Sequence, residues 1–337
     1  MKGRFDAIVV GAGPAGAAYA LAAANDGRRV LLAGTPRRHL PNTLEVVAGR
    51  AVEPLTALGM VDAVTAGATP CTGTLSRWSG ADFAHIPSLL APFGGGWIVD
   101  RSAVDPRLVR AAEDSGVARV PERVLACEPS PGGWTVGFSS GRARAARLVL
   151  ATGRASPLPA RAGIARRAVH RLVGLVGWTS ERLPGLDSQL LLDRAPEGWW
   201  FAIGRGDGTS LGYCTDADLM CRSGDRVRET WIRAATHGWP AAASVRPGVR
   251  IGTTATLAGP LPAHVQVIGD AALAVDPLSG HGLALALETA TRAAMDPERY
   301  GAWLDGAAQV HAEQERVVYA SAAADGVFWR RRTRPPA

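Results

Sequence analysis

The chain has 337 residues, 47% of them hydrophobic, so it is long enough to bury a sizeable core and to form about two domains. Its formal charge of +7 comes mostly from scattered arginines without a nucleic-acid-binding motif, so a nucleic-acid partner is not expected. Four cysteines without a CxxC pair predict reduced thiols in a cytoplasmic protein and no metal site, and the absence of an uninterrupted apolar run of about 18 residues argues against a membrane-spanning helix.

The amino-terminal segment predicts a βαβ unit with a glycine-rich turn. The expected elements are a strand at 5–10, a helix at 14–26 and a strand at 29–33. In the turn before the helix, Gly11 allows a tight bend, Gly13 lets the backbone approach a phosphate, and Gly16 allows close helix–strand packing. The free N–H groups and the positive dipole end of the helix suit a dinucleotide diphosphate.

The end of the second strand departs from the usual dinucleotide fingerprint. That fingerprint places an acid there to bind the ribose, but Ala33 and Gly34 stand at this point. Arg37 and Arg38 follow and are candidates to contact the adenosine or its phosphates. Binding of NADP through its 2′-phosphate is an alternative for these arginines, although it conflicts with the second glycine motif described below.

Residues 43–151 predict an amphipathic helix among strands and turns. The expected elements are a helix at 43–59, a turn-rich region at 66–96, a helix at 102–115, and strands at 117–127, 133–139 and 148–151. Ser102 is the expected N-cap of the second helix, and Gly116 is its stop signal. Arg101 stands where a positive charge opposes the helix dipole, so we expect it to have an anionic partner such as a diphosphate.

Residues 168–258 alternate strand-like runs and predict an antiparallel sheet. The expected elements are strands at 172–178, 188–192, 199–203, 210–213 and 249–257 and a helix at 223–236, followed by a strand at 265–269 and a helix at 279–295. Trp199 and Trp200 are neighbours on one strand, so one is expected to be structural and the other to face a cavity. The basic tail, residues 326–337, is expected to be a solvated terminus.

A second glycine-containing segment follows the strand expected at 265–269. Gly269 and Asp270 end that strand, and the sequence Asp276-Pro277-Leu-Ser-Gly280-His281-Gly282 leads into the next helix. The carboxylate of Asp270 can accept hydrogen bonds from sugar hydroxyls, and the helix N-terminus can stabilise negative charge on a bound cofactor. His281 is a candidate acid or base, with a loop histidine that bonds the backbone as the alternative.

Both glycine segments, in this order and about 250 residues apart, resemble those of the FAD-dependent monooxygenase and tryptophan halogenase superfamily. The strand Gly198-Trp199-Trp200 and the turn Thr215-Asp-Ala-Asp-Leu219 are similar to those of the flavoprotein maturases that hydroxylate tryptophan in quinone-cofactor enzymes. The resemblance implies that FAD is bound by Gly11, Gly13, Gly16, Arg38, Arg101, Gly269, Asp270, Pro277, Gly280 and Gly282.

Two departures from the superfamily narrow the expected chemistry. Its halogenases use a catalytic lysine in the second domain, and this chain has no lysine after Lys2, which excludes halogenation by that mechanism. In hydroxylases that use nicotinamide the corresponding sequence is often Asp-Gly, and here Thr152 replaces the Asp. This argues against the use of NAD(P)H in the way those hydroxylases use it. The electrons are expected to come from NAD(P)H or from a partner flavin reductase.

The expected fold is α/β, a Rossmann-type FAD-binding domain with an inserted antiparallel-sheet substrate domain of the aromatic hydroxylase type. The expected FAD-binding domain comprises residues 1–70, 98–166 and 260–325, and the substrate domain residues 71–97 and 167–259. The expected reaction is FAD-dependent hydroxylation of an aromatic small molecule or a tryptophan-bearing peptide, with an indole as the ring. The candidate residues are His281, His39 and Asn42 for catalysis and Trp199 and Trp200 for substrate contact.

Two alternatives stay open at the level of the sequence. A flavin-dependent dehydrogenase or reductase of the geranylgeranyl-reductase type is compatible with Ala151-Thr152-Gly153 in place of Asp-Gly. A degenerate flavoprotein that acts only as a binding protein is compatible with the missing acid after the second strand.

Overall fold

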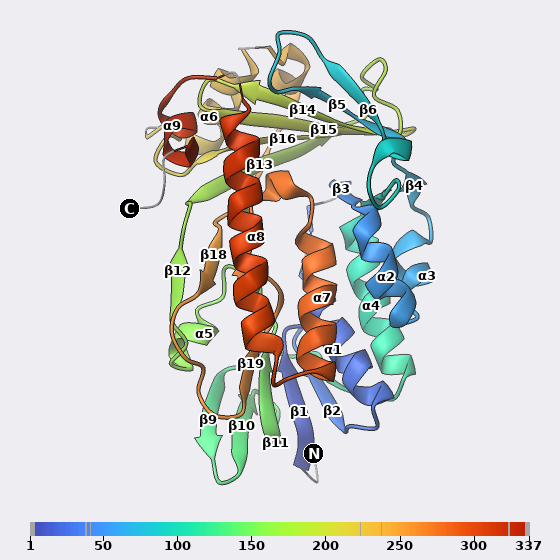
Figure 1. Ribbon diagram of the computed structural model, residues 1–337, viewed down its shortest axis with the longest axis vertical. Coiled ribbons are helices and arrows are strands. Elements are labelled where there is room, and N and C mark those ends of the chain that lie inside the picture. Colours follow the sequence, from blue (N-terminus) through green and yellow to red (C-terminus); the bar gives the residue numbers. More distant parts are fainter. Residues whose placement is uncertain are drawn as a thin grey trace.

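The computed structural model describes residues 4–37, 39–40, 42–222, 224–236, 238–322 and 324–333. Within this part of the chain, two seven-stranded sheets are accompanied by two three-stranded ones (Figure 1). The lower sheet in that view, here called sheet A, contains the amino-terminal strand, and the upper sheet, sheet C, contains the two neighbouring tryptophans. The mixed α/β class and the Rossmann-type fold expected from the sequence are confirmed.

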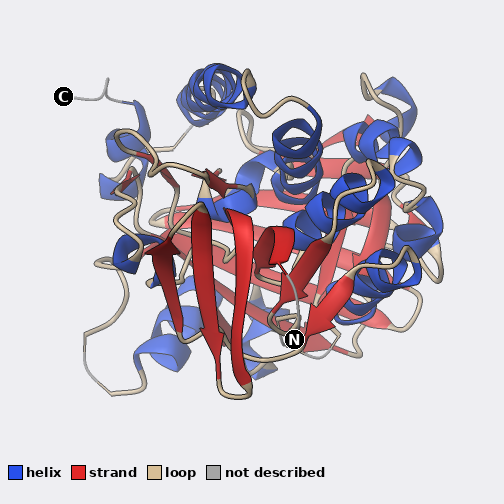
Figure 2. Cartoon of the chain, turned by 90° about the horizontal axis from the view of Figure 1, so that it is seen from below, coloured by secondary structure: helices blue, strands red, loops and turns tan. Residues whose placement is uncertain are grey.

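Sheet A has a parallel centre and an antiparallel edge. Its strands, in pairing order, are β8 (Ala118–Val120), β2 (Val30–Ala33), β1 (Arg4–Val10), β11 (Gly141–Leu150), β10 (Gly133–Phe138) and β9 (Ala126–Ser130), with β19 (Val265–Val267) beside the end of β11. Strand β1 runs parallel to β2 and β11, and β19 runs parallel to β11. Seen from below, the strands of this sheet lie beside a layer of helices (Figure 2). The carboxyl ends of the parallel strands therefore meet at one edge.

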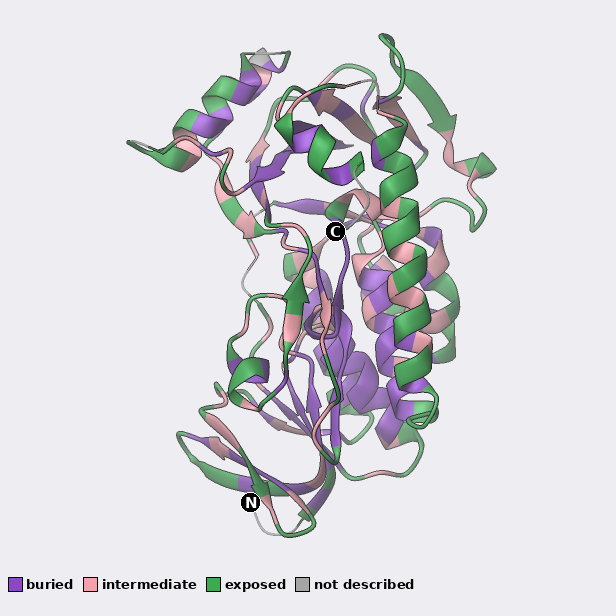
Figure 3. Ribbon diagram, turned by 60° about the vertical axis from the view of Figure 1, so that its left-hand side comes forward, coloured by how far each residue is buried: buried purple, intermediate pink, exposed green. Residues whose placement is uncertain are grey.

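The helices beside sheet A are built to pack closely. They are α1 (Pro14–Asn25), α2 (Val52–Ala57), α3 (Val61–Thr65), α4 (Arg101–Asp114), α5 (Leu158–Arg161) and α7 (Gly282–Met295). Helix α1 is rich in alanine and is buried almost throughout, which lets α7 approach it without large side chains between them. Figure 3 shows that buried residues concentrate in this half of the molecule.

Sheet C joins segments from two parts of the chain. Its order is β17 (Gly248–Ile251), β13 (Leu172–Thr179), β16 (Gly208–Asp216), β15 (Gly198–Arg205), β14 (Gln189–Ala195), β5 (Gly73–Arg77) and β6 (Ala84–Pro87). All neighbours are antiparallel except β14 and β5, which run parallel. Helix α6 (Arg226–Ala235) and the 3-10 turn η3 (Pro240–Ser244) cover one face through Trp231 and Ala242.

Two three-stranded sheets accompany the large ones, and their strands alternate along the chain with strands of the large sheets or follow them. One joins β3 (Leu44–Val47), β7 (Trp97–Asp100) and β4 (Thr69–Pro70), and the other joins β12 (Arg166–Ala168), β18 (Ala255–Leu257) and β20 (Leu273–Ala274). The remaining 3-10 turns are η1 (Gly49–Ala51), η2 (Ser88–Leu90), η4 (Gly269–Ala271) and η5 (Pro277–Ser279).

Several local predictions differ from the structure. The helix expected at 43–59 is strand β3 followed by η1 and α2, because residues 44–47 pair with β7. The turn-rich region at 66–96 contains β5 and β6, which extend sheet C. The N-cap of α4 is Asp100, whose carboxylate accepts a hydrogen bond from the backbone N–H of Ser102 at 2.8 Å.

The carboxyl-terminal segment forms two helices, α8 (Tyr300–Ala320) and α9 (Val327–Thr333). In Figure 1, α8 runs along both halves of the molecule, and α9 lies against sheet C. The solvated terminus expected from the arginine run was wrong for residues 327–333. Phe328 and Trp329 are buried in a cluster with Trp199 and other residues of sheet C. Arg332 is buried because it pairs with Asp216 of β16.

Candidate functional site

The glycine turn, residues 11–16, is closed by contacts that only glycine permits. A Cβ atom on Gly11 would lie 2.2 Å from the carbonyl oxygen of Ala151, and one on Gly16 would lie 1.8 Å from the carbonyl oxygen of Gly11. A Cβ atom on Gly13 would meet nothing within 4 Å. The turn is therefore tight on its protein side and open at Gly13, as a backbone that receives a phosphate must be.

Helices α1 and α7 present uncapped N-termini at the same edge of sheet A. Neither N-cap residue, Gly13 or His281, makes a side-chain capping bond, and neither helix has an acid in its first turn. Arg28, just after α1, donates to the carbonyl oxygen of Ala294 near the end of α7 at 2.7 Å. Because the carboxyl ends of the helices are adjacent and the helices pack along their length, their N-termini point the same way. Two positive dipole ends at one edge favour an anionic ligand.

The segment Gly269–Asp270 lies against the start of α1. A Cβ atom on Gly269 would lie 2.7 Å from the Cβ atom of Ala15. The Asp270 carboxylate accepts a hydrogen bond from Arg154 Nε at 2.9 Å, and its backbone carbonyl accepts one from Arg166 at 2.8 Å. The two glycine motifs, far apart in the sequence, thus share one edge of the sheet.

The Asp-Pro loop, residues 276–282, leads from that edge into α7. The buried Asp276 carboxylate accepts a hydrogen bond from the backbone N–H of Leu278 at 2.9 Å and so caps the 3-10 turn that Pro277 begins. Gly280 has a φ of 63°, in the left-handed region, and a Cβ atom on Gly280 or Gly282 would meet nothing within 4 Å. The loop therefore has an open side next to the N-terminus of α7.

His281 is held in a neutral state. Its Nδ1 lies 3.5 Å from an Arg50 guanidinium nitrogen, and its ring centroid lies 5.5 Å from that of His311 on α8. Burial, the Arg50 charge and His311 lower the pKa of His281 to about 4. Near neutral pH the imidazole is uncharged, so it is poorly suited to act as a general acid.

A charged network joins β3, α4 and β17. Arg101 donates to Glu45 at 2.9 Å and to Asp105 at 2.7 Å, and Arg250 donates to Glu45 at 3.0 Å. His39 Nε2 lies 2.9 Å from Asp105. The anionic partners of Arg101 are thus two carboxylates of the protein itself, and its contact with a diphosphate stays a prediction.

The network keeps Arg101 and Asp105 ionised despite their burial. Burial alone would lower the pKa of Arg101, but the charges of Glu45 and Asp105 raise it. Burial would likewise raise the pKa of Asp105, but Arg101 and the hydrogen bond from His39 hold it below its usual value. The sequence analysis missed Glu45 and Arg250, which bridge the small sheet to sheet C, because no motif marks a pair 205 residues apart.

The other predicted catalytic residues are His39 and Asn42. The side chain of His39 is buried, and its Nδ1 has no hydrogen-bond partner among the described residues. Asn42 is exposed and has a φ of 56°. Arg38 lies outside the described residues. Whether His39 and Asn42 contribute to catalysis stays a prediction.

Trp199 and Trp200 point to opposite faces of sheet C, and both are buried. Trp200 packs with Trp231 and Trp239 beneath α6, and contact of either Trp199 or Trp200 with a substrate stays a prediction. Trp199 faces the other way, and its indole N–H donates to the hydroxyl of Tyr319 on α8 at 3.1 Å. On the same face as Trp199, Phe201 packs against the small sheet that contains β3 and β7.

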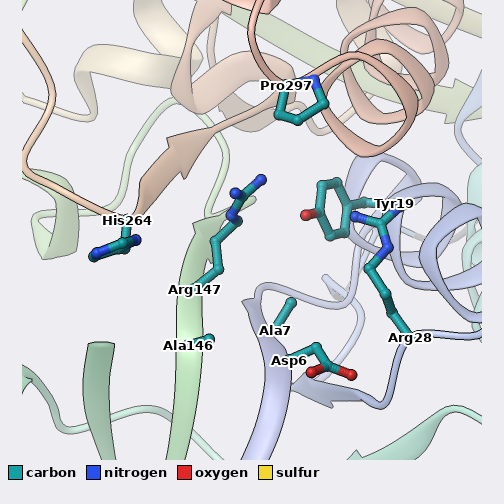
Figure 4. Close-up of a pocket in the computed structure, with 8 residues that line it drawn as sticks. All are labelled: Asp6, Ala7, Tyr19, Arg28, Ala146, Arg147, His264 and Pro297. Atoms are coloured by element: carbon teal, nitrogen blue, oxygen red, sulfur yellow. The ribbon is translucent and has the colours of Figure 1, made fainter. Parts of the chain in front are cut away.

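A cavity of about 280 Å³ lies at the opposite end of sheet A (Figure 4). It is lined by Asp6, Ala7, Tyr19, Arg28, Ala146, Arg147, His264 and Pro297. Tyr19, Arg28 and Arg147 already have protein partners. Tyr19 and Arg147 both donate to Gln266, and Arg28 donates to the carbonyl oxygen of Ala294. This cavity lies toward the amino ends of the parallel strands, away from the glycine turn.

The residues at the glycine edge fit FAD. The open backbone at Gly13 and the N-terminus of α1 suit the diphosphate, the Asp270 carboxylate suits the ribityl hydroxyls, and the N-terminus of α7 suits the polar edge of the ring. Among the described residues no cluster of three or more His, Cys, Asp or Glu could hold a metal ion, and no helix there is both long and apolar enough to span a membrane.

Comparisons by sequence point to flavoenzymes. No protein-family model matches the chain. It is 27% identical over 304 residues to LodB of Marinomonas mediterranea, which is named as an FAD-dependent oxidoreductase, and the match covers 85% of this chain and 82% of LodB. It is 29% identical over 333 residues to a menaquinone reductase of Mycobacterium tuberculosis, covering 86% of this chain and 75% of that protein.

Comparisons by structure give the same fold. The peptidyl tryptophan dihydroxylase QhpG, described as essential for tryptophylquinone cofactor biogenesis, superposes with a TM-score of 0.82 at 24% identity over 99% of this chain and 80% of QhpG. The myxobacterial FAD-dependent halogenase CndH gives a TM-score of 0.79 at 22% identity over 97% and 85%. The chain has the fold of flavin-dependent halogenases and hydroxylases, as the resemblance in sequence implied, and these similar proteins are all enzymes.

Proposed function

We propose that the chain binds FAD along the edge formed by the glycine turn, Gly269–Asp270 and the Asp-Pro loop, and that it is an FAD-dependent monooxygenase of aromatic rings. One observation carries the proposal: two parallel helices present uncapped N-termini at one sheet edge, with open space beside Gly13. An anionic dinucleotide would be stabilised by both dipoles. The FAD-dependent relatives support the same cofactor.

Bound FAD, once reduced, supplies the electrons with which dioxygen is activated for insertion of an oxygen atom into the ring. The protein orients the ring and excludes water. Phe201 and Ile203 of β15, together with Leu44 and Ile98 of the small sheet, form an apolar layer between the two halves that suits this task. Asp270, held by Arg154, would orient the sugar chain of the cofactor.

We favour the indole of tryptophan, or of a tryptophan-bearing peptide, as the substrate. An electron-rich ring needs little activation by acids or bases, which agrees with the neutral state of His281. The likeness to QhpG, whose description names peptidyl tryptophan, supports the same class. Lysine-dependent halogenation is not proposed, because the chain has no lysine after Lys2. The electrons would come from NAD(P)H or from a partner flavin reductase.

The test begins with the purified protein titrated with FAD and followed by its visible spectrum and flavin fluorescence. The loaded protein is then reduced, mixed with oxygen and offered a panel of indoles, tryptophan and tryptophan-bearing peptides. The expected result is a product that is heavier by an oxygen atom, with the label of ¹⁸O₂ incorporated. FAD-loaded protein that consumes oxygen without such a product from any of them would overturn the monooxygenase assignment, and protein that ignores FAD would favour a binding role.

A second candidate is a flavin-dependent reductase. The 29% identity to menaquinone reductase over most of the chain favours it, together with Ala151-Thr152-Gly153 at the end of β11. Such an enzyme would deliver hydride to an unsaturated substrate and would need no oxygen. Stoichiometric oxidation of the reduced protein by an isoprenoid quinone under anaerobic conditions, without any product in air from the indole panel, would select this function.

A further inference from the structure

The inner stripe of helix α8 changes character along its length. Tyr300 and Leu304 are buried in the core beside sheet A. Further along the same face, at steps of four residues, come His311, Glu315 and Tyr319, which are half-buried or buried. The inner face of α8 therefore carries titratable side chains in place of apolar ones where the helix passes the Asp-Pro loop. A polar inner face is costly unless each group has a partner.

Tyr319 makes two buried hydrogen bonds at the top of this stripe. Its hydroxyl donates to Asp276 Oδ2 at 3.0 Å and accepts from Trp199 Nε1 at 3.1 Å. The other oxygen of Asp276 accepts the backbone N–H of Leu278 in the Asp-Pro loop. All three side chains in this chain of hydrogen bonds are at most 3% exposed. One hydroxyl thus connects the loop to a strand of sheet C.

The position of that hydroxyl is fixed by α9. The ring of Tyr319 meets Phe328 and Trp329 edge-on, with centroids 6.0 and 5.9 Å away. The buried Arg332 guanidinium lies 5.2 Å from the same ring and pairs with Asp216 at 2.6 Å. The carboxyl-terminal helices, and not the loop itself, therefore set where the donor to Asp276 stands.

We propose that Tyr319 is a positioning residue, which holds the Asp-Pro loop in the shape that receives the cofactor through its hydrogen bond to Asp276. The inference rests on the proposed binding of FAD at this edge. A buried tyrosine that only satisfied its hydroxyl could use any carbonyl, as Tyr300 does with Val267 at 2.7 Å. Tyr319 instead contacts the same carboxylate that caps the loop.

The contact between Tyr319 and Asp276 is sensitive to pH, because Asp276 can lose its charge by protonation. The groups that face it are Glu315 and Tyr319 of α8, Arg332 of α9 and Cys214 of β16. Burial, followed by the negative charge of Glu315, raises the pKa of Asp276 to about 6, while the Leu278 N–H, Arg332 and the Tyr319 hydroxyl act in the opposite direction. Removing the hydroxyl raises this pKa further, so Asp276 becomes protonated at a higher pH and holds the loop less firmly.

The first experiment measures hydrogen exchange of peptides that cover residues 276–282, without FAD. Tyr319→Phe should speed exchange there roughly tenfold, as expected for one lost bond to a charged group. Trp199→Phe should give a smaller change in the same direction. The matched control is Tyr300→Phe, which also removes a buried hydroxyl from α8 but lies away from the loop. No difference between Tyr319→Phe and Tyr300→Phe in this segment would overturn the proposal.

The second experiment measures the dissociation constant for FAD from about pH 5 to 8. Tyr319→Phe should bind roughly tenfold more weakly near pH 7 and move the midpoint of the pH profile upward, whereas Asp276→Asn should bind weakly with a flat profile. Wild-type protein that does not bind FAD at all would refute the proposed function, while the exchange result would still decide the role of Tyr319. Tight FAD binding by Tyr319→Phe with a wild-type profile would refute positioning alone.

Discussion

The glycine turn and the Asp-Pro loop lie at the same edge of sheet A, and each precedes a helix whose N-terminus has no side-chain cap. The two segments are held in place in different ways. The turn is closed by backbone against backbone, since Gly11 and Gly16 each lie too near a carbonyl oxygen to carry a Cβ atom. The loop is held by side chains: its own Asp276 caps Leu278, and Tyr319 of α8 donates to the same carboxylate. Arg50, also from outside the loop, lies beside His281. A backbone-built site is rigid and local, whereas a site built by remote side chains can be altered from a distance.

The largest expected effect on stability comes from a substitution that disrupts the glycine turn. Gly16→Ala places a Cβ atom 1.8 Å from the Gly11 carbonyl oxygen, and backbone atoms cannot yield as a flexible side chain can. We expect a loss of more than about 3 kcal/mol of unfolding free energy, or no folded protein. Chemical denaturation followed by circular dichroism measures it.

The control for that change is Gly13→Ala. Its Cβ atom meets no protein atom within 4 Å, and Gly13 has an ordinary φ of −91°. Stability should stay within about 0.5 kcal/mol of wild type. Affinity for FAD should fall, because the methyl group would occupy the space assigned to the diphosphate. Equal instability of both variants would contradict the distinction between the closed and the open side of the turn.

The next largest effect on stability comes from a substitution in α9, which packs against Tyr319 and so supports the loop from outside it. Arg332→Met removes a buried guanidinium from Asp216, and about 3 kcal/mol should be lost, as is typical when a buried ion pair loses one partner. Arg331→Met is the matched control, since Arg331 pairs with Asp216 and Asp218 but has a side chain that is 41% exposed, so the loss should be under about 1 kcal/mol. Urea denaturation compares the two, and equal losses would show that α9 is not anchored by Arg332.

A third effect concerns the pH dependence of stability and acts through His281 of the loop. The pKa of His281 is lowered to about 4 in the folded protein from 6.5, so unfolding takes up a proton between these values, and its contribution to stability is lost as the pH falls through this window. His281→Gln should reduce that acid sensitivity, while His85→Gln, at an exposed position, should not. Denaturation midpoints measured from pH 4 to 6.5 test this, and an unchanged slope in His281→Gln would contradict it.

Asp276 works in the opposite direction. Its pKa is raised to about 6 in the folded protein, so its contribution to the stability of the whole fold is present at low pH and is lost as the pH rises through that value. The ionised form is nevertheless the one that the hydrogen bonds from Leu278 and Tyr319 favour, so protonation weakens the hold on the loop even where it favours the fold. Once His281 is replaced, this opposite slope should become visible in the same measurement.

The smallest expected effect compares two aspartates that cap a following turn. Asp100 caps α4 at 2.8 Å much as Asp276 caps its loop at 2.9 Å, but in the part of the chain that the structure describes no tyrosine donates to Asp100 as Tyr319 does to Asp276. Asp100→Ala should cost about 1 kcal/mol, and Ser102→Ala less than about 0.5 kcal/mol. Thermal unfolding tests both, and the reverse order would restore Ser102 as the cap.

The contrast between a site built from adjacent residues and a site built from distant ones also explains which features were predictable from the sequence. The glycine turn was predictable because a strand, three spaced glycines and a helix are adjacent in the chain. The partner of Arg101 was predictable as an anion but not as Glu45, since that contact depends on the pairing of β3 with β7. The burial of Arg332 was not predictable, because its partner, Asp216, lies 116 residues away in the sequence.

The path of the chain between the two large sheets bears on how the protein is made. It enters sheet A, passes through β5 and β6 of sheet C, returns to sheet A, completes sheet C, and only then supplies β19. The parallel pair of β5 and β14 joins residues more than a hundred positions apart, as in Gly73 opposite Gln189. Such long-range pairing folds slowly. We therefore expect a chain still on the ribosome to hold two incomplete sheets, with the carboxyl end of β11 exposed until β19 emerges to pair with it.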